Sequence, residues 1–173
     1  MANTYQLIEA KTVSTAVASI EFTSIPQIYT DLCLKFSGRN NRSAQVLEEF
    51  LLTLNNNNNT IYSEKGIRGN GSSVANNSPT GQTELQDFGQ PGAGATANTF
   101  SNWEVYIPNY TSSNNKSVQF DGVTENNATE AYAYLNAGLF SSTTAISSLK
   151  VRCKSTHLID VYSTFYLYGI KNS

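Results

Sequence analysis

His157 is the only histidine in the chain, and it lies between Cys153 and Asp160 in the segment CKSTHLID. A cysteine beside a histidine base is the arrangement of a covalent nucleophile, because the base takes the proton of the attacking group. On an extended strand, however, four residues span about 13 Å, too far for the hydrogen bond between Cys153 and His157 that this mechanism needs. A cysteine on a neighbouring strand, Cys33, is the alternative partner. We interpret His157 as a solvent-exposed turn residue and expect no catalytic residue.

The acidic residues also fail to form a recognisable reactive pair. Glycoside hydrolysis uses two carboxylates that face each other across a cleft. Glu48 and Glu49 are adjacent, so on a strand their side chains point to opposite faces. The segment FDGVTENN, with Asp121, Glu125 and Asn126, is rich in oxygen ligands but lacks the order of acids and the central glycine of an EF-hand loop. We therefore expect these carboxylates to solvate the surface.

The two cysteines, Cys33 and Cys153, are too few for a disulfide framework. Together with His157 they supply fewer ligands than the four of a structural zinc site. We therefore expect two reduced thiols near the core, no bound metal and no cofactor.

The composition excludes several classes of protein. Charged residues make up 14% of the 173 residues, against roughly 25% in an average globular domain. The net charge is −2 and the eleven Lys and Arg residues are scattered, so no basic stripe for nucleic acid is expected. No apolar run approaches the ~20 residues that span a bilayer, which argues against membrane insertion. The first residues, MANTYQLIEAKT, do not resemble a signal peptide, so we expect synthesis in a cytosol.

The elements that would position any site are strands, because side chains alternate along most of the chain. In IYTDLCLKF, residues 28–36, the set Ile28, Leu32, Leu34 and Phe36 points one way. This period of two predicts a half-buried strand. The same alternation predicts strands in five further segments: 16–22, 103–107, 118–120, 149–153 and 161–168.

Two apolar segments are ambiguous between helix and strand. VLEEFLLTL, residues 46–54, contains good helix formers, but an Asn run follows at once and its neighbours are strands, so we favour a strand. AYAYLNAGLF, residues 131–140, is also interpreted as a strand, with Tyr132 and Tyr134 on one face. The connections are polar, and the Gly-rich stretch 66–94 reads as a long loop with one short strand near 83–88.

Eight to ten short antiparallel strands separated by polar turns predict an all-β fold, a jelly-roll-like β-sandwich. We expect residues 1–173 to form one domain. A last strand that pairs inside a sheet would explain why the chain ends on the aromatic-rich stretch YSTFYLYGIKNS.

With no reactive motif, the chemistry that remains is surface binding. Tyrosine offers a large contact area at little cost in entropy, and Asn and Ser offer adaptable hydrogen bonds. Such a surface suits another protein, a sugar or an identical subunit. The aromatic residues that we expect to contact a partner are these: Trp103, Tyr106, Tyr110, Tyr162, Tyr166 and Tyr168.

Five segments along the chain carry a further signal, and they are, in order, MANTYQLIEAKTV, SIEFTSIPQIYTDL, FSGRNNRS, ANTFSNWEVYIPNYTSSNNKSV and YSTFYLYGIKNS. In matching order these segments resemble a family of small virion structural proteins of marine and cyanobacterial tailed phages. The chain departs from that family at VLEEFLLTLNNNNN, where relatives more often show a strand ending in Phe-Asn-Gly. The resemblance brings no catalytic residues with it, and it implies that the protein is located in the virion.

The resemblance leaves two functions open. One is a capsid decoration or cement protein that binds the major capsid protein, as a homo-oligomer such as a trimer at a local threefold axis. The other is a tail-associated module that sits among the tail proteins and recognises host surface polysaccharide through Trp103, Tyr106 and Tyr110. An enzyme, such as a depolymerase, is the least favoured alternative.

Overall fold

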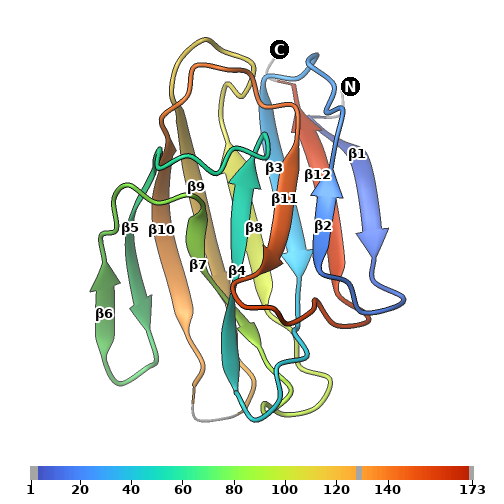
Figure 1. Cartoon of the computed structure of the whole chain (residues 1–173), viewed down its shortest axis with the longest axis vertical. Coiled ribbons are helices and arrows are strands. Elements are labelled where there is room, and N and C mark those ends of the chain that lie inside the picture. Colours follow the sequence, from blue (N-terminus) through green and yellow to red (C-terminus); the bar gives the residue numbers. More distant parts are fainter. Residues whose placement is uncertain (1–3, 128–129, 172–173) are drawn as a thin grey trace.

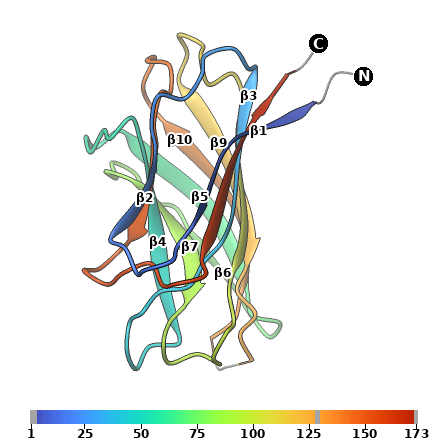
Figure 2. The ribbon, with the colours of Figure 1, turned by 90° about the vertical axis from the view of Figure 1, so that its right-hand side faces the viewer.

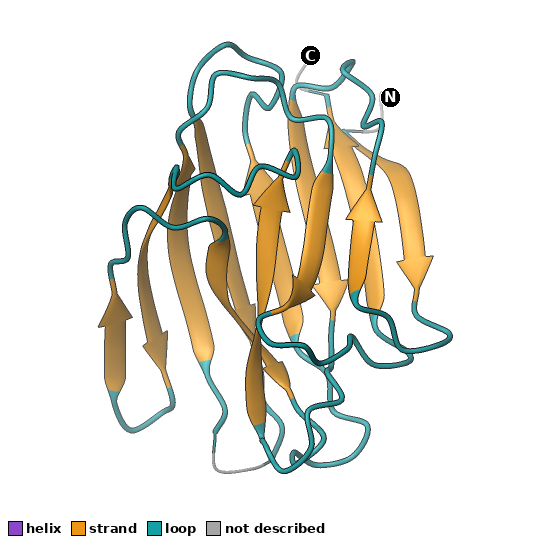
Figure 3. Cartoon of the chain, viewed as in Figure 1, coloured by secondary structure: helices purple, strands orange, loops and turns teal. Residues whose placement is uncertain are grey.

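The computed structural model describes residues 4–127 and 130–171, and this part of the chain consists of strands joined by loops (Figures 1 and 3). The predicted all-β class is confirmed. Twelve strands are present in the described residues, and their bounds are as follows: β1 (Tyr5–Thr12), β2 (Ser19–Phe22), β3 (Asp31–Ser37), β4 (Leu47–Leu54), β5 (Tyr62–Gly69), β6 (Val74–Asn77), β7 (Leu85–Pro91), β8 (Asn102–Ile107), β9 (Lys116–Val123), β10 (Ala133–Phe140), β11 (Leu149–Cys153) and β12 (Thr164–Ile170).

The strands form two sheets that pack face to face as a sandwich (Figure 2). The larger sheet has eight strands in the order β1-β12-β3-β8-β9-β10-β5-β6, and the smaller has four in the order β2-β11-β4-β7. Every pairing between neighbouring strands is antiparallel. The prediction of an antiparallel β-sandwich is therefore correct.

The pairings are nested in the manner of a jelly roll. Strand β5 pairs with β6, β4 with β7, β3 with β8, β2 with β11 and β1 with β12, so each pair encloses the one before it along the chain. Successive pairs alternate between the larger and the smaller sheet. The hairpin β9–β10 is an addition that lies between β8 and β5 and widens the larger sheet.

The core lies between the two sheets and is rich in stacked aromatic rings. Phe36 is at its centre, with ring centroids 5.3 Å from Phe165, 6.0 Å from Phe88 and 6.4 Å from Trp103. Phe88 in turn stacks on Phe120 at 4.5 Å. These rings come from strands of both sheets, so their packing holds the two layers together.

The predicted alternation is largely correct. Segment 46–54 forms β4 and segment 131–140 contains β10, as favoured, and Tyr134 faces the core while Tyr132 packs against it. The prediction that Ile28 belongs to the inward set of the strand at 28–36 is wrong, because Ile28 precedes β3 and is 66% exposed.

The predicted polar loop 66–94 is the larger error. Its first residues belong to β5 and its middle contains β6, whereas the short strand predicted near 83–88 is confirmed as β7. Strand β6 reads VANN and carries no apolar alternation, so it is held by backbone pairing with β5 rather than by burial. The additional strands β1, β5 and β6 raise the number above the expected eight to ten.

The aromatic C-terminal stretch forms β12, which pairs with β1 on one side and β3 on the other. Its placement between two strands confirms that this stretch is tied into a sheet. Within residues 4–127 and 130–171, no helix has the length and hydrophobicity needed to cross a membrane.

Candidate functional site

The outer surfaces of the two sheets differ in chemistry. The smaller sheet presents charged side chains that pair across its strands, because Glu21, Lys150 and Arg152 alternate with the inward residues of β2 and β11. Three ion pairs cover this face or its rim: Glu21–Lys150, Glu84–Arg152 and Glu49–Lys154. These ion pairs make the outer face of the smaller sheet polar, and its charged side chains already have partners of opposite charge.

The larger sheet instead exposes apolar side chains on its outer face. Nine large apolar or tyrosine side chains are exposed among the described residues, and seven of them lie on this face. The seven are these: Tyr5, Leu7, Ile67, Val74, Val123, Leu135 and Leu139. Scattered exposed apolar residues are ordinary, but their collection on one face of one sheet makes this face the candidate interaction surface.

Five of the seven lie on four neighbouring strands, and we call them the apolar patch: Ile67, Val74, Val123, Leu135 and Leu139. They come from the neighbouring strands β6, β5, β10 and β9. The pleat of β10 places Leu135 and Leu139 outward, because the residues that alternate with them, such as Tyr134 and Phe140, are buried. Leu135 stands directly opposite Ile67 of β5, so their side chains share the face.

A shallow trough of about 740 Å³ is lined by Ile67 and Leu135 of the apolar patch and by residues of β9 and β6 beside them. Its floor is formed by small residues, since Ala137 and Ser117 lie beside the larger Leu135 and Ile67. Lys65 and Gln119 form part of its polar rim. A hollow with an apolar floor and a polar rim has the form in which a protein partner inserts an anchoring side chain.

The opposite end of the same face is rich in tyrosine. Tyr166 and Tyr168 of β12 are half-buried on the outside, and the ring of Tyr5 meets Tyr168 edge-on at 6.1 Å between centroids. Beside them Lys35 forms an ion pair with Glu104 at 2.7 Å. This end therefore offers aromatic and charged contacts, whereas the patch end offers aliphatic ones.

Tyr106 is also on this face, but its hydroxyl is already engaged. It donates a hydrogen bond to Asp31 Oδ2 at 2.7 Å, and this bond, together with burial, raises the pKa of Tyr106 to about 12. Its ring edge is available to a partner, while its hydroxyl is held by β3.

Two of the predicted contact residues are buried, so they cannot touch a partner directly. Trp103 is 1% exposed, and its indole nitrogen donates to the Gly89 carbonyl at 3.1 Å. Tyr110 is fully buried, and its hydroxyl donates to the Pro26 carbonyl. Both belong to the core. Tyr162 is 73% exposed, yet it lies in the turn before β12 with φ +68° and does not share the face of Tyr166 and Tyr168.

The sequence signal for the apolar patch was ambiguous. In YLNAGLF, β10 carries apolar residues on both faces, so alternation alone does not say which set is covered. The neighbours of Ile67 in SEKGIRG are polar residues and glycines, and such a composition predicts a loop rather than a strand. The apolar residues on both faces of β10 are the one feature of these strands that indicates an exposed apolar face.

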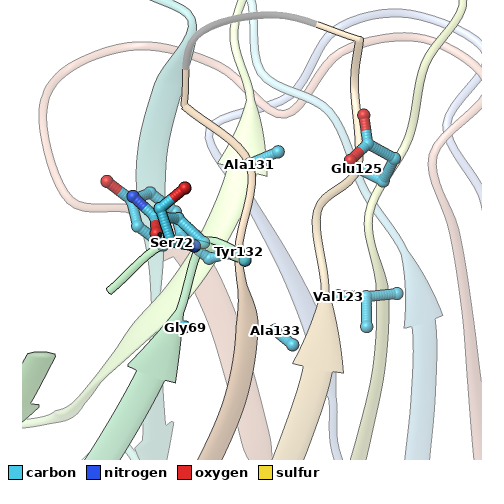
Figure 4. A pocket seen from close by; sticks show the side chains of 9 residues that line it. Gly69, Ser72, Val123, Glu125, Ala131, Tyr132 and Ala133 are labelled. Carbon is cyan, nitrogen blue, oxygen red and sulfur yellow. Dashed lines mark hydrogen bonds between the residues drawn. The ribbon is translucent and has the colours of Figure 1, made fainter. Parts of the chain in front are cut away.

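A second hollow, of about 520 Å³, lies at the tip of the β5–β6 hairpin, next to the ends of β9 and β10 (Figure 4). In Figure 4, Ser72 and Tyr132 lie on one side and Val123 and Glu125 on the other. Asn70, also in its lining, caps its own turn by accepting from the backbone N–H groups of residues 72 and 73. The guanidinium of Arg68 lies 5.0 Å from the Tyr132 ring centroid.

The residues with nucleophilic or basic side chains, the two cysteines and His157, lie in different elements of the fold. Cys153 is buried in the smaller sheet, whereas Cys33 is buried in the larger sheet between its cross-strand neighbours Tyr106 and Tyr168. The expectation of two free thiols near the core is confirmed. His157 lies in the loop after β11 and is partly exposed. In the described part of the chain, no group of three or more His, Cys, Asp or Glu residues is placed to hold a metal ion.

Both thiols are expected to be unreactive in the folded protein. Burial raises the pKa of Cys33 and of Cys153 to about 12, so at pH 8 almost no thiolate is present to attack a reagent. Iodoacetamide at pH 8 should therefore leave both cysteines unmodified in the native protein and alkylate both in 6 M guanidinium, as measured by intact mass. Stoichiometric labelling of either cysteine in the native state would contradict the burial described.

Comparisons with protein-family models and with curated proteins give no match. Among solved structures, one that matches is the CBM2 module of the evolved Dit protein of Lactobacillus casei BL23 phage J-1. The match has 11% sequence identity and a TM-score of 0.26, and it covers 90% of this chain and 69% of that chain. A TM-score this low does not indicate a shared arrangement of strands, so no conclusion about function is drawn from the match.

Proposed function

We propose that the chain is a non-enzymatic structural protein of a tailed-phage virion that decorates the capsid, and that it binds the major capsid protein through the outer face of the larger sheet. The observation that supports this most directly is the collection of seven exposed apolar or tyrosine side chains on that one face. The segments that resemble small phage virion proteins, such as SIEFTSIPQIYTDL, support the virion as its location.

The energetics of the face suit a protein partner. Burial of apolar surface stabilises a complex by roughly 25 cal/mol per Å², and a specific interface covers about 800 Å² on each partner. The apolar patch and the tyrosine end together extend from β6 to β1 across the whole larger sheet. An oligomer, such as a trimer at a local threefold axis of the shell, would present several copies of this face to neighbouring capsid subunits.

Purified protein is expected to bind capsids that lack it. Sedimentation of such capsids with increasing amounts of the chain should show saturable uptake, and quantitative gels of complete virions should show hundreds of copies. Capsids that take up no protein, combined with only a few copies per virion, would rule out decoration.

A second candidate function is a tail-associated module that recognises host surface polysaccharide. It is favoured by the hollow at the β5–β6 tip, whose lining combines the Tyr132 side chain with polar groups of Asn70, Ser72 and Glu125. A sugar is bound by such a mixture of aromatic and hydrogen-bonding groups. If the purified protein binds no glycan on an array of host-type glycans and does not inhibit phage adsorption, this function is excluded.

A further inference from the structure

Polar side chains gather inside the fold where the far end of the larger sheet meets edge strand β7 of the smaller sheet. Glu64 and Asn136 point inward from β5 and β10 and are only 2% and 3% exposed. Asn77 of β6 and Asp87 of β7 complete this group. We call these four residues the oxygen cluster. In Figure 1 the strands that carry them lie together at one side of the sandwich.

The contacts within the cluster join the two sheets. Glu64 Oε1 accepts a hydrogen bond from the backbone N–H of Gln86 in β7 at 2.9 Å. Because β7 is an edge strand of the smaller sheet, this backbone group bonds to a side chain of the larger sheet instead of to a neighbouring strand. The side-chain amide of Asn77 donates to Asp87 Oδ2, which links β6 to β7. Asp87 itself has φ +63°, a left-handed conformation that is uncommon outside glycine and Asn or Asp.

The two amide oxygens of the cluster converge on one point. Gly66 pairs with Asn77 on one side and with Asn136 on the other. A Cβ atom at Gly66 would lie 2.0 Å from Asn136 Oδ1 and 2.6 Å from Asn77 Oδ1. Both side chains therefore turn their oxygens toward the Cα atom of Gly66, and a larger residue at this position would displace them.

Several atoms of the cluster lack the partners that buried polar groups normally have. Glu64 Oε2 and Asn77 Oδ1 accept no hydrogen bond from any described residue, and Asn136 Nδ2 is also without a partner there. Buried acceptors of this kind cost free energy unless something supplies positive charge or a donor. A cavity of about 120 Å³, lined in part by Glu49, Asn77 and Asp87, adjoins them.

The carboxylates of the cluster are not held in ion pairs, although Arg68 lines the same cavity as Asp87. Neither Glu64 nor Asp87 forms an ion pair with a Lys or Arg side chain in the described residues.

We propose that the oxygen cluster binds a hard divalent cation, and that Ca²⁺ fits it best, through the Glu64 and Asp87 carboxylates and the amide oxygens of Asn77 and Asn136. Carboxylate and amide oxygens in irregular geometry are the ligands of Ca²⁺, whereas Zn²⁺ and other softer metals select sulfur and imidazole. The cavity has room for one or two waters that would complete the shell. The ion would fasten β7 to β5, β6 and β10.

The test uses the full chain after treatment with EDTA. Titration with CaCl₂ should raise the Tm in a saturable manner, by about 5–10 °C when free Ca²⁺ is a hundredfold above the Kd, and MgCl₂ should raise it less. The variants Glu64→Gln and Asp87→Asn should remove the Ca²⁺-dependent rise. Asp121→Asn and Glu125→Gln, which change carboxylates outside the cluster, should keep it.

A second readout does not depend on whether the variants fold. Tb³⁺ bound at the cluster should show luminescence sensitised by Tyr134, which lies beside Asn136 on β10, and Ca²⁺ should displace it. Absence of both a Tm shift and displaceable Tb³⁺ luminescence in the wild-type chain would mean that the cluster holds only water. A Tm shift that persists in Glu64→Gln and Asp87→Asn would place the cation elsewhere. Either result overturns the proposal.

Discussion

Replacement of Phe165 by alanine is expected to lower the free energy of unfolding by about 3–5 kcal/mol, because it removes a buried ring and leaves a cavity. Phe165 is fully buried on the inner face of β12. Its ring stacks on Phe36 at 5.3 Å and on Phe50 at 6.5 Å, so it touches aromatic residues from both sheets. Urea denaturation followed by circular dichroism measures the change.

Tyr166 is the matched control for this substitution, because it is the next residue on β12 and points to the outside. Tyr166→Ala removes an aromatic ring of similar size from a half-buried position, and we expect a loss of roughly 1 kcal/mol. Equal losses for the two variants, or a larger loss for Tyr166→Ala, would show that the two faces of β12 are reversed.

The second large effect concerns the apolar patch. The double variant Ile67→Asp/Leu135→Asp places two carboxylates on the apolar patch of the proposed capsid interface, where each would be desolvated on binding. Loss of a hot-spot contact costs about 2 kcal/mol or more, and the two buried carboxylates should cost at least this much, so we expect at least a roughly 30-fold weaker uptake by capsids that lack the chain. The fold should be retained, because Ile67 and Leu135 are 50% and 54% exposed.

Ile28→Asp is the control for this experiment, since Ile28 is 66% exposed and lies in the loop before β3 rather than in the patch. It makes the same chemical change and should leave capsid uptake unaltered. A double variant that binds as well as the wild type, with an unchanged Tm, would show that the apolar patch is not the docking surface.

Much of the fold could be predicted because apolar and polar side chains alternate along the strands, and the apolar set is the one that the fold buries. Strands β3, β8 and β11 carry apolar residues at every second position, and the structure buries that set. The helix formers of β4 did not prevent a correct assignment, since tertiary pairing with β7 and β11 outweighs local propensity.

The remaining features depend on contacts that no local pattern encodes. Strand β6 exists because backbone groups of VANN pair with β5, and its side chains leave no apolar signature. Trp103 and Tyr110 are residue types that are common in binding surfaces. Their polar atoms instead donate hydrogen bonds to the backbone carbonyls of Gly89 and Pro26 inside the fold. The partners of the oxygen cluster come from four strands, so spacing along the chain could not bring them together.

The nesting of the strand pairs also bears on how fast the chain reaches its fold. The innermost pair, β5 with β6, is joined by a short turn, whereas β1 and β12 meet only after almost the whole chain has been traversed. Closing such long loops loses entropy before any contact is gained, so chains with this topology fold in milliseconds to seconds rather than microseconds. Until β12 arrives, β3 presents a bare edge to other chains, and assembly of the outer pair is the step during which aggregation competes with folding.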